Sequence, residues 1–235
     1  MQVPQPEPVV IVGRGRIGRP LASRLVHQGN VQFARIDPVA GLSGAATRIN
    51  TLIIAISNRA RQPGGPLWRW PEIFAGLRRQ AQDGTMRIDR AVMVSSTGVW
   101  SGIERGFVDA ATPPRPGRQA HQDILAAERE LQDCAEQIRI VRAAGLIGSG
   151  YHVYWPMIRT ATDRPRFAVE TMDVVDRLAW LATHAGWPSG VDLLSDGSVW
   201  WQGRRLVADR GDARVRRLAQ TDKVLLRSHA EYPLA

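Results

Sequence analysis

Three glycines with the spacing Gly13-x-Gly15-x-x-Gly18 are the residues of this chain most clearly placed for chemistry. They follow the apolar run 9–12 directly and precede a stretch whose apolar residues recur at helical spacing. In that setting the first glycine permits a tight turn, the second lets the backbone approach a pyrophosphate, and the third lets helix and strand pack closely. The pyrophosphate then meets free N–H groups at the positive end of the helix dipole.

The spacing therefore predicts a dinucleotide-binding turn, and a glycine turn without a ligand is the alternative. The residues expected to contact the cofactor are Gly13, Arg14, Gly15, Arg16, Ile17 and Gly18, with Asp37 and Ser57 further along the chain.

Asp37 follows the glycine turn at the distance expected for the residue that binds the ribose, roughly 20 residues on. It comes at the end of 31–36, an alternating stretch that predicts the second strand. A carboxylate at this place repels a 2′-phosphate and favours NAD. Arg14, Arg16 and Arg35 point the other way, because guanidinium groups bind phosphate well. We therefore expect NAD or NADP, with NAD favoured.

Alternating strands and helices position these residues. Strands are predicted at 8–12, 31–36, 51–57, 90–96, 138–142 and 190–194, and helices at 68–82, 119–135 and 174–184, with another directly after the glycine turn. Strands that alternate with helices at this spacing indicate βαβ units. The predicted fold is α/β, a Rossmann-type doubly wound parallel sheet with a small C-terminal substrate lobe. We expect a disordered lead-in over 1–8, a dinucleotide-binding Rossmann unit over 9–150, and the lobe over 151–235, packed on that unit.

Composition excludes several function classes. The formal net charge is +9 and the sequence pI is about 11.1, but 30 of the 31 basic residues are arginines spread along the chain, so nucleic-acid binding is not expected. No apolar run approaches the roughly 20 residues that cross a bilayer. The single Cys134 fits a reducing compartment and predicts a cytoplasmic location. No cluster has metal-ligand spacing, so no metal is expected.

Several blocks of the first 150 residues carry a family resemblance. They are Val94-Ser-Ser-Thr-Gly-Val-Trp100, Val108-Asp109, Thr112-Pro113-Pro114, Leu125-Ala-Ala-Glu128 and Ile140-Val-Arg-Ala-Ala-Gly-Leu-Ile-Gly148. Together with the glycine turn, they resemble the extended short-chain dehydrogenase/reductases, and more narrowly the atypical NAD-dependent epimerase/dehydratase-like members. The resemblance covers about 9–150 and implies a homodimer.

The resemblance implies a Ser/Thr–Tyr–Lys centre in which tyrosine exchanges a proton with the substrate. Ser96 occupies the serine position. Ala120 and Ile124 stand where the tyrosine and the lysine are expected, and no Tyr or Lys occurs between 101 and 150. The only lysine, Lys223, belongs to the C-terminal tail. We therefore expect an atypical site without the Tyr-x-x-x-Lys dyad.

Few side chains could replace the tyrosine. His121 neighbours the lost position, and its unperturbed pKa of about 6.5 suits proton transfer. Tyr151 and His152 fall where the resemblance places the substrate-facing loop. Alternative interpretations are an exposed histidine at a helix start and an aromatic packing cluster.

The function expected from these residues is that of an NAD(P)-binding, oxidoreductase-like enzyme that acts on a small metabolite, with Ser96, His121, Tyr151 and His152 as candidate catalytic residues. A non-redox isomerase or lyase on the same fold is one alternative. A non-catalytic dinucleotide-binding sensor or interaction protein is the other.

Overall fold

The structure is a computed structural model of the 235-residue chain. It describes residues 8–45, 47–56, 60–61, 67–68, 70–148, 165–184, 186–201 and 204–226. Except for Pro8, the lead-in expected over 1–8 lies outside these residues.

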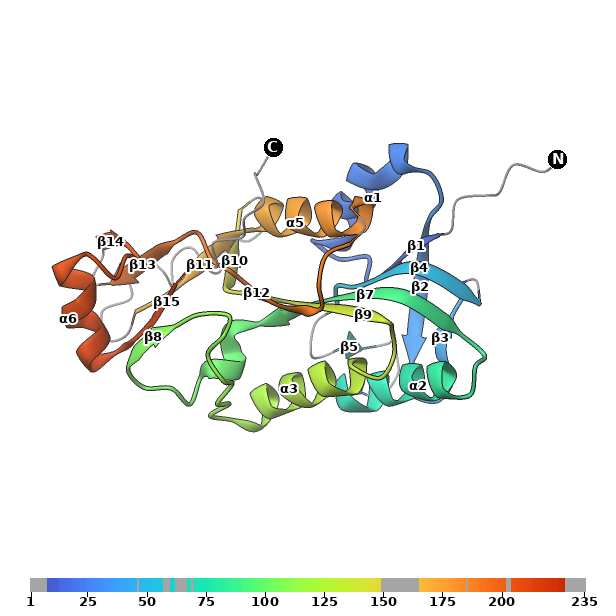
Figure 1. The fold of residues 1–235 in the computed structure, drawn as a ribbon, viewed down its shortest axis with the longest axis horizontal. Helices are drawn as coiled ribbons and strands as arrows, with labels where there is room; N and C mark the ends of the chain where they lie inside the picture. The colour runs from blue at the N-terminus through green and yellow to red at the C-terminus, as the bar shows by residue number, and fades with distance from the viewer. Residues whose placement is uncertain are drawn as a thin grey trace. The chain divides into compact units, whose positions relative to one another are not determined.

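A seven-stranded sheet forms the centre of the fold, with the order β12-β9-β7-β4-β1-β2-β3 (Figure 1). Its strands are β1 (Val9–Val12), β2 (Val31–Asp37), β3 (Gly41–Ser43), β4 (Arg48–Ile54), β7 (Arg87–Ser96), β9 (Gln137–Ala143) and β12 (Gly190–Leu194). β1 pairs in parallel with β2 and β4, and β4 pairs in parallel with β7. The short β3 runs antiparallel to its neighbour, β2. The predicted Rossmann-type α/β fold is confirmed.

The chain forms two compact units, and each is built from three segments. The first contains 1–94, 123–140 and 175–190, and the second contains 95–122, 141–174 and 191–235. The boundary predicted at residue 150 falls in 149–164, outside the described residues, and that division stays a prediction.

Helices cover both faces of the sheet in the first unit. They belong to α1 (Gly18–Leu25), α2 (Trp70–Gln82), α3 (Gln119–Leu131) and α5 (Thr171–Thr183). In Figure 1, α1 and α5 lie over one face, and α2 and α3 lie over the other. Because both faces are covered, β1 and β4 bury nearly continuous apolar runs, Val10 to Val12 and Thr51 to Ile54. Strands that are buried on both faces are typical of a doubly wound sheet.

The second unit contains short strands that the sequence analysis did not predict. β8 (Gly106–Val108) pairs in parallel with β15 (Lys223–Leu225), β10 (Gly145–Ile147) pairs in parallel with β11 (Ala168–Glu170), and β13 (Ser198–Trp201) pairs with β14 (Arg204–Val207) in antiparallel fashion. The unit also contains a 3₁₀ turn, η2 (Thr97–Trp100), and the helix α6 (Ala213–Thr221). Strands of three or four residues are too short for periodicity to identify them.

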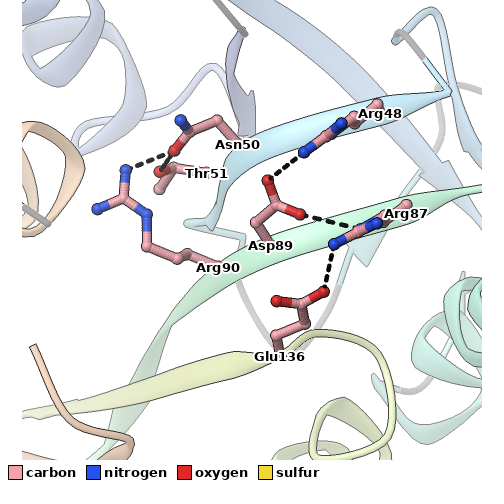
Figure 2. Close-up of polar contacts among 7 residues, drawn as sticks. All are labelled: Arg48, Asn50, Thr51, Arg87, Asp89, Arg90 and Glu136. Carbon is pink, nitrogen blue, oxygen red and sulfur yellow. Dashed lines mark hydrogen bonds and ion pairs between the residues drawn. The ribbon is translucent and has the colours of Figure 1, made fainter. Parts of the chain in front are cut away.

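Arg90 of β7 joins three elements of the first unit, and Figure 2 shows its bond to Asn50. One guanidinium nitrogen bonds to the Asn50 side chain on β4, and the other donates to the carbonyl of His184 at 2.7 Å. A further bond reaches the carbonyl of Ala182 at 3.4 Å, so the cation satisfies carbonyls at the C-terminal end of α5. Arg90 therefore ties β4, β7 and α5 together, and its burial lowers the pKa of the guanidinium.

Arg87, three residues earlier on the same strand, makes a contrasting set of contacts (Figure 2). It pairs with Glu136 at 2.7 Å and with Asp89 at 3.2 Å, and its side chain is 60% exposed. Exposed ion pairs contribute little to stability because water screens them.

We predict that Arg90→Met lowers the free energy of unfolding by about 2 kcal/mol, the amount typical of a lost charge-assisted hydrogen-bond set. The matched variant Arg87→Met is expected to cost less than about 1 kcal/mol. Urea unfolding followed by tryptophan fluorescence measures both. Equal losses in the two variants would contradict the role given to Arg90.

Candidate functional site

The glycine turn begins where β1 ends, beside the end of β4. Gly13 has a φ of 110°, a conformation that other residues rarely adopt. A Cβ there would overlap the carbonyl oxygen of Ala55, whose own N–H donates to the Val12 carbonyl at 2.8 Å. Close approach of the two chain segments therefore requires glycine at position 13.

Packing also requires glycine at position 18. It is the first residue of α1, and a Cβ there would overlap the carbonyl oxygen of Gly13 and lie 3.4 Å from Ile11. The start of the helix can lie this close to the strand only because position 18 carries no side chain.

Gly15 differs from both. A Cβ added at this position meets no atom within 4 Å, so the described fold leaves room for a side chain there. The packing of the chain explains Gly13 and Gly18 but does not explain Gly15. The open surface over Gly15 is where a ligand could approach the backbone.

The N-terminal end of α1 suits an anion. Ile17 precedes the helix, no side chain caps it, and its first turn contains no acidic residue. The N–H of Arg19 already donates to the carbonyl of Gly15 at 3.2 Å, and Pro20 has no N–H. The helix dipole, with the N–H groups that remain at the helix start, favours a bound phosphate. Because β1 lies between β2 and β4, the turn also stands at the point where the strand order reverses, the usual ligand position in such sheets.

The turn places its remaining side chains differently. Ile17 is 8% exposed and belongs to the core, so only its backbone is available to a ligand. Arg14 is exposed, and its guanidinium lies 4.9 Å from the centre of the Phe33 ring on β2. Arg16 is also exposed. The two cations leave the turn positively charged.

Asp37 ends β2, as expected, and holds the turn that follows. Its Oδ1 accepts hydrogen bonds from the backbone N–H of Ala40, at 2.9 Å, and of Val39, at 2.8 Å. These two bonds lower the pKa of the carboxyl group below its usual range. Oδ2 makes no hydrogen bond within the described part of the chain, so this oxygen could accept from a ligand hydroxyl.

Helix α2 fixes the same turn from the other side. The Arg79 guanidinium donates to the carbonyl of Pro38 at 2.6 Å, and the Gln80 amide donates to the carbonyl of Ala40 at 2.9 Å. Gln80 also accepts from the N–H of Leu42 at 2.6 Å. The position of the Asp37 carboxylate is therefore set by packing across the first unit.

Ser96 and His121 converge on Gly98 in the second unit. The Ser96 hydroxyl accepts from the N–H of Gly98 at 3.1 Å and caps η2. His121 lies beside the same glycine, because a Cβ on Gly98 would be 2.7 Å from its Cδ2 and 2.8 Å from its Nε2. Two of the candidate catalytic residues, Ser96 at the start of η2 and His121 on α3, thus lie beside the same glycine.

Two further residues, which the sequence analysis did not select, belong to this cluster. Ser101 Oγ lies 2.6 Å from His121 Nδ1 and accepts from the N–H of Gly117 at 2.8 Å. Lys223 does not lie in a free tail but in β15, where Nζ donates to the carbonyl of Trp100 at 2.9 Å. Its burial lowers the pKa of the ammonium group. Sequence spacing gives no signal for a residue that tertiary pairing of β15 with β8 brings in.

The electrostatics of the cluster keep His121 neutral. Partial burial lowers the pKa of the imidazole, and the positive charges of Arg118 and Lys223 lower it further. The lowered pKa favours the neutral imidazole at pH 7, the form that can act as both a hydrogen-bond donor and an acceptor.

Other candidates stand apart. Ser57, Tyr151 and His152 lie outside the described residues, and their roles stay predictions. Cys134 is buried, and desolvation with nearby carboxylates raises the pKa of its thiol to about 12, which removes it as a nucleophile.

Among the described residues, no group of three His, Cys, Asp or Glu side chains could hold a metal. No helix in the described parts of the chain is long and apolar enough to cross a bilayer.

Comparison with known proteins identifies the fold. No protein-family model and no curated protein sequence matches this chain. Among solved structures, MoeE5 in complex with UDP-glucose and NAD is similar, with a TM-score of 0.61, 20% identity, and coverage of 92% of this chain and 84% of that one. An NAD-dependent NDP-hexosamine 5,6-dehydratase, TunA, has a TM-score of 0.60 at 17% identity, with 94% and 85% covered. UDP-N-acetylglucosamine 4-epimerase from Bacillus cereus has a TM-score of 0.62 at 12% identity, with 82% and 77% covered.

The chain shares their fold. At these identities the likeness establishes the architecture, and the chemistry must be argued from the residues themselves.

The contrast between two glycines gives a stability prediction. Gly18→Ala is expected to lower the free energy of unfolding by about 2–3 kcal/mol, because the methyl group overlaps backbone that cannot yield cheaply. Gly15→Ala is expected to change stability by less than about 0.5 kcal/mol. Chemical denaturation of both variants without cofactor tests this, and a loss at Gly15 as large as that at Gly18 would show that position 15 is also packed.

Proposed function

We propose that this chain is an NAD-dependent enzyme, oxidoreductase-like, that acts on a small metabolite. The single observation that carries the proposal is the open glycine at position 15. It lies between two glycines that packing requires, beside an uncapped helix start, at the reversal point of a parallel sheet. A dinucleotide pyrophosphate is the ligand that needs this combination.

Residues of the first unit would bind different parts of the cofactor. The backbone around Gly15 would hold the pyrophosphate, and Oδ2 of Asp37 would accept from the ribose hydroxyls. Because the lowered pKa keeps Asp37 ionised, a 2′-phosphate would meet a fixed negative charge, which favours NAD over NADP. The bound nicotinamide supplies a site that takes up or returns a hydride.

Ser96 and His121 of the second unit are the groups that we assign to the substrate. The hydroxyl of Ser96 would orient a substrate oxygen, and the imidazole of His121 would act on the same oxygen. Both belong to one small cluster around Gly98, whereas the positions expected for tyrosine and lysine hold Ala120 and Ile124. The acid–base centre is therefore proposed to be atypical.

The printed names of the similar structures suggest the first substrates to try. They concern UDP-glucose, UDP-N-acetylglucosamine and an NDP-hexosamine. These names also favour a second candidate function, an epimerase or a dehydratase, which would leave no net change in the dinucleotide. The homodimer and the cytoplasmic location stay predictions.

The decisive experiment is a titration of the purified chain with NADH and NADPH, followed by nucleotide fluorescence and by quenching of the eight tryptophans. We expect NADH to bind more tightly than NADPH. Gly15→Ala is expected to weaken the binding of NADH at least tenfold, which corresponds to about 1.4 kcal/mol, while leaving the unfolding transition unchanged.

Asp37→Asn provides the matched control, since it removes the charge and keeps an oxygen for the turn. We expect it to narrow the preference for NADH over NADPH by raising the affinity for NADPH. No binding of either nucleotide to the folded wild-type chain would overturn the proposal. Tight binding without turnover of any sugar nucleotide would point to a sensor instead.

Turnover separates the two candidate enzymes. With UDP-glucose, UDP-N-acetylglucosamine and related sugar nucleotides, an oxidoreductase accumulates NADH in proportion to product, which absorbance measures directly. An epimerase or dehydratase changes the sugar with no net NADH, as NMR of the products would show.

A further inference from the structure

Ser101 contacts His121 at the nitrogen whose protonation decides the tautomer of the ring. The hydroxyl oxygen accepts from the backbone N–H of Gly117, a group that can only donate. The hydroxyl oxygen keeps a second lone pair, so its contact with His121 Nδ1 at 2.6 Å can run in either direction. With the hydroxyl as donor, its proton goes to Nδ1, the acceptor in reach within the described part of the chain. A neutral imidazole whose Nδ1 accepts must carry its proton on Nε2.

The protonated nitrogen lies against a residue without a side chain. A Cβ on Gly98 would stand 2.8 Å from Nε2, so any other residue there would displace the ring. Among the described residues, His121 makes no side-chain hydrogen bond through Nε2. The N–H group therefore remains available to a ligand beside the turn that also carries Ser96.

Lys223 holds this turn in place. Its ammonium group donates to the carbonyl of Trp100, the residue directly before Ser101. Trp100 is itself fully buried, its indole N–H donates to the carbonyl of Thr112 at 2.9 Å, and the Arg142 guanidinium lies 4.7 Å from the centre of its ring. Trp100 is thus fixed on several sides, and the Lys223 bond fixes the backbone that positions Ser101.

The charges around the ring have one sign. Arg118 precedes α3 and Lys223 lies on β15, while the residues that flank η2, Ser96 and Ser101, contribute uncharged hydroxyls. Both cations oppose protonation of His121, as does its partial burial. The same lysine that fixes the turn therefore also helps to keep the imidazole neutral.

Building on the proposed function, we propose that Ser101 and Lys223 are positioning residues that present His121 as a neutral imidazole with Nε2–H directed to a substrate oxygen. Such a group stabilises negative charge that develops on a carbonyl or alcohol oxygen without itself transferring a proton, and the proton that this oxygen gains or loses is exchanged with water. In this chain it would supply the hydrogen bond for which the resemblance expects a tyrosine hydroxyl.

The test is ¹⁵N NMR of the histidine side chains of the full chain without cofactor, between pH 5 and 8. The chain has five histidines, and His121→Gln identifies the signals of His121. We expect the Nε2-protonated tautomer at pH 7.5 and a titration midpoint below about 6.5. A protonated Nδ1, or a midpoint above that value, would overturn the proposal.

Variants separate the effect of hydrogen bonding on the tautomer of His121 from the effect of nearby positive charge on its pKa. Ser101→Ala is expected to give a mixture of tautomers, and Ser101→Thr, which keeps the hydroxyl, is expected to restore the single one. Lys223→Met and Arg118→Gln each remove one positive charge and are both expected to raise the pKa of His121. Only Lys223→Met should also disturb the tautomer, because Arg118 does not hold Trp100. An unchanged tautomer in Ser101→Ala would contradict the proposal.

Kinetics with a substrate that turns over give the second readout. His121→Ala is expected to lower kcat about 10²-fold with the affinity for NAD unchanged. His121→Gln, whose amide keeps a hydrogen-bond donor, should retain more activity than His121→Ala. Its rate should depend on pH in the same way as the wild-type rate. If Gln is as inactive as Ala, and the wild-type rate follows protonation of His121, the ring acts as a proton donor and the proposal fails. The NMR result does not depend on NAD binding, so failure of the proposed function remains distinguishable.

Discussion

The contact between the start of α1 and the end of β1 is the constraint on which the first unit depends. Gly18 lies against the carbonyl of Gly13, and Gly13 in turn lies against the carbonyl of Ala55 at the end of β4. Three segments therefore meet with no side chain between them. The helix starts without a side-chain cap and the backbone at Gly15 is open, so a structural requirement creates the conditions for binding an anion.

In the second unit, hydrogen bonds between polar groups hold the candidate site together. Its cluster depends on polar groups with limited choices: an amide of Gly117 that can only donate, a hydroxyl of Ser101 that must place its proton, and an imidazole that can accept it. The ammonium group of Lys223 adds a fixed charge and a fixed carbonyl partner. Partial burial strengthens each of these preferences, because water competes less for the same groups.

Much of the central sheet could be predicted from the sequence because its strands are buried on both faces. Val9–Val12, Arg87–Ser96 and Gln137–Ala143 contain apolar runs that have few alternative structures. The strand predicted at 51–57 is found at Arg48–Ile54, since Arg48 is polar but still pairs with β7. β3 was missed because three residues held by the Gln80 side chain carry no periodic signal.

The sequence alone determined the glycine turn, the place of Asp37 and the order of strands and helices, because each depends on residues that are close along the chain. Only the tertiary structure distinguished Gly15, which is open, from Gly13 and Gly18, which are packed. It also brought Lys223 to a turn more than a hundred residues earlier, through the pairing of β15 with β8. Such a pairing is decided by burial and hydrogen bonding between distant segments, and no local pattern records it.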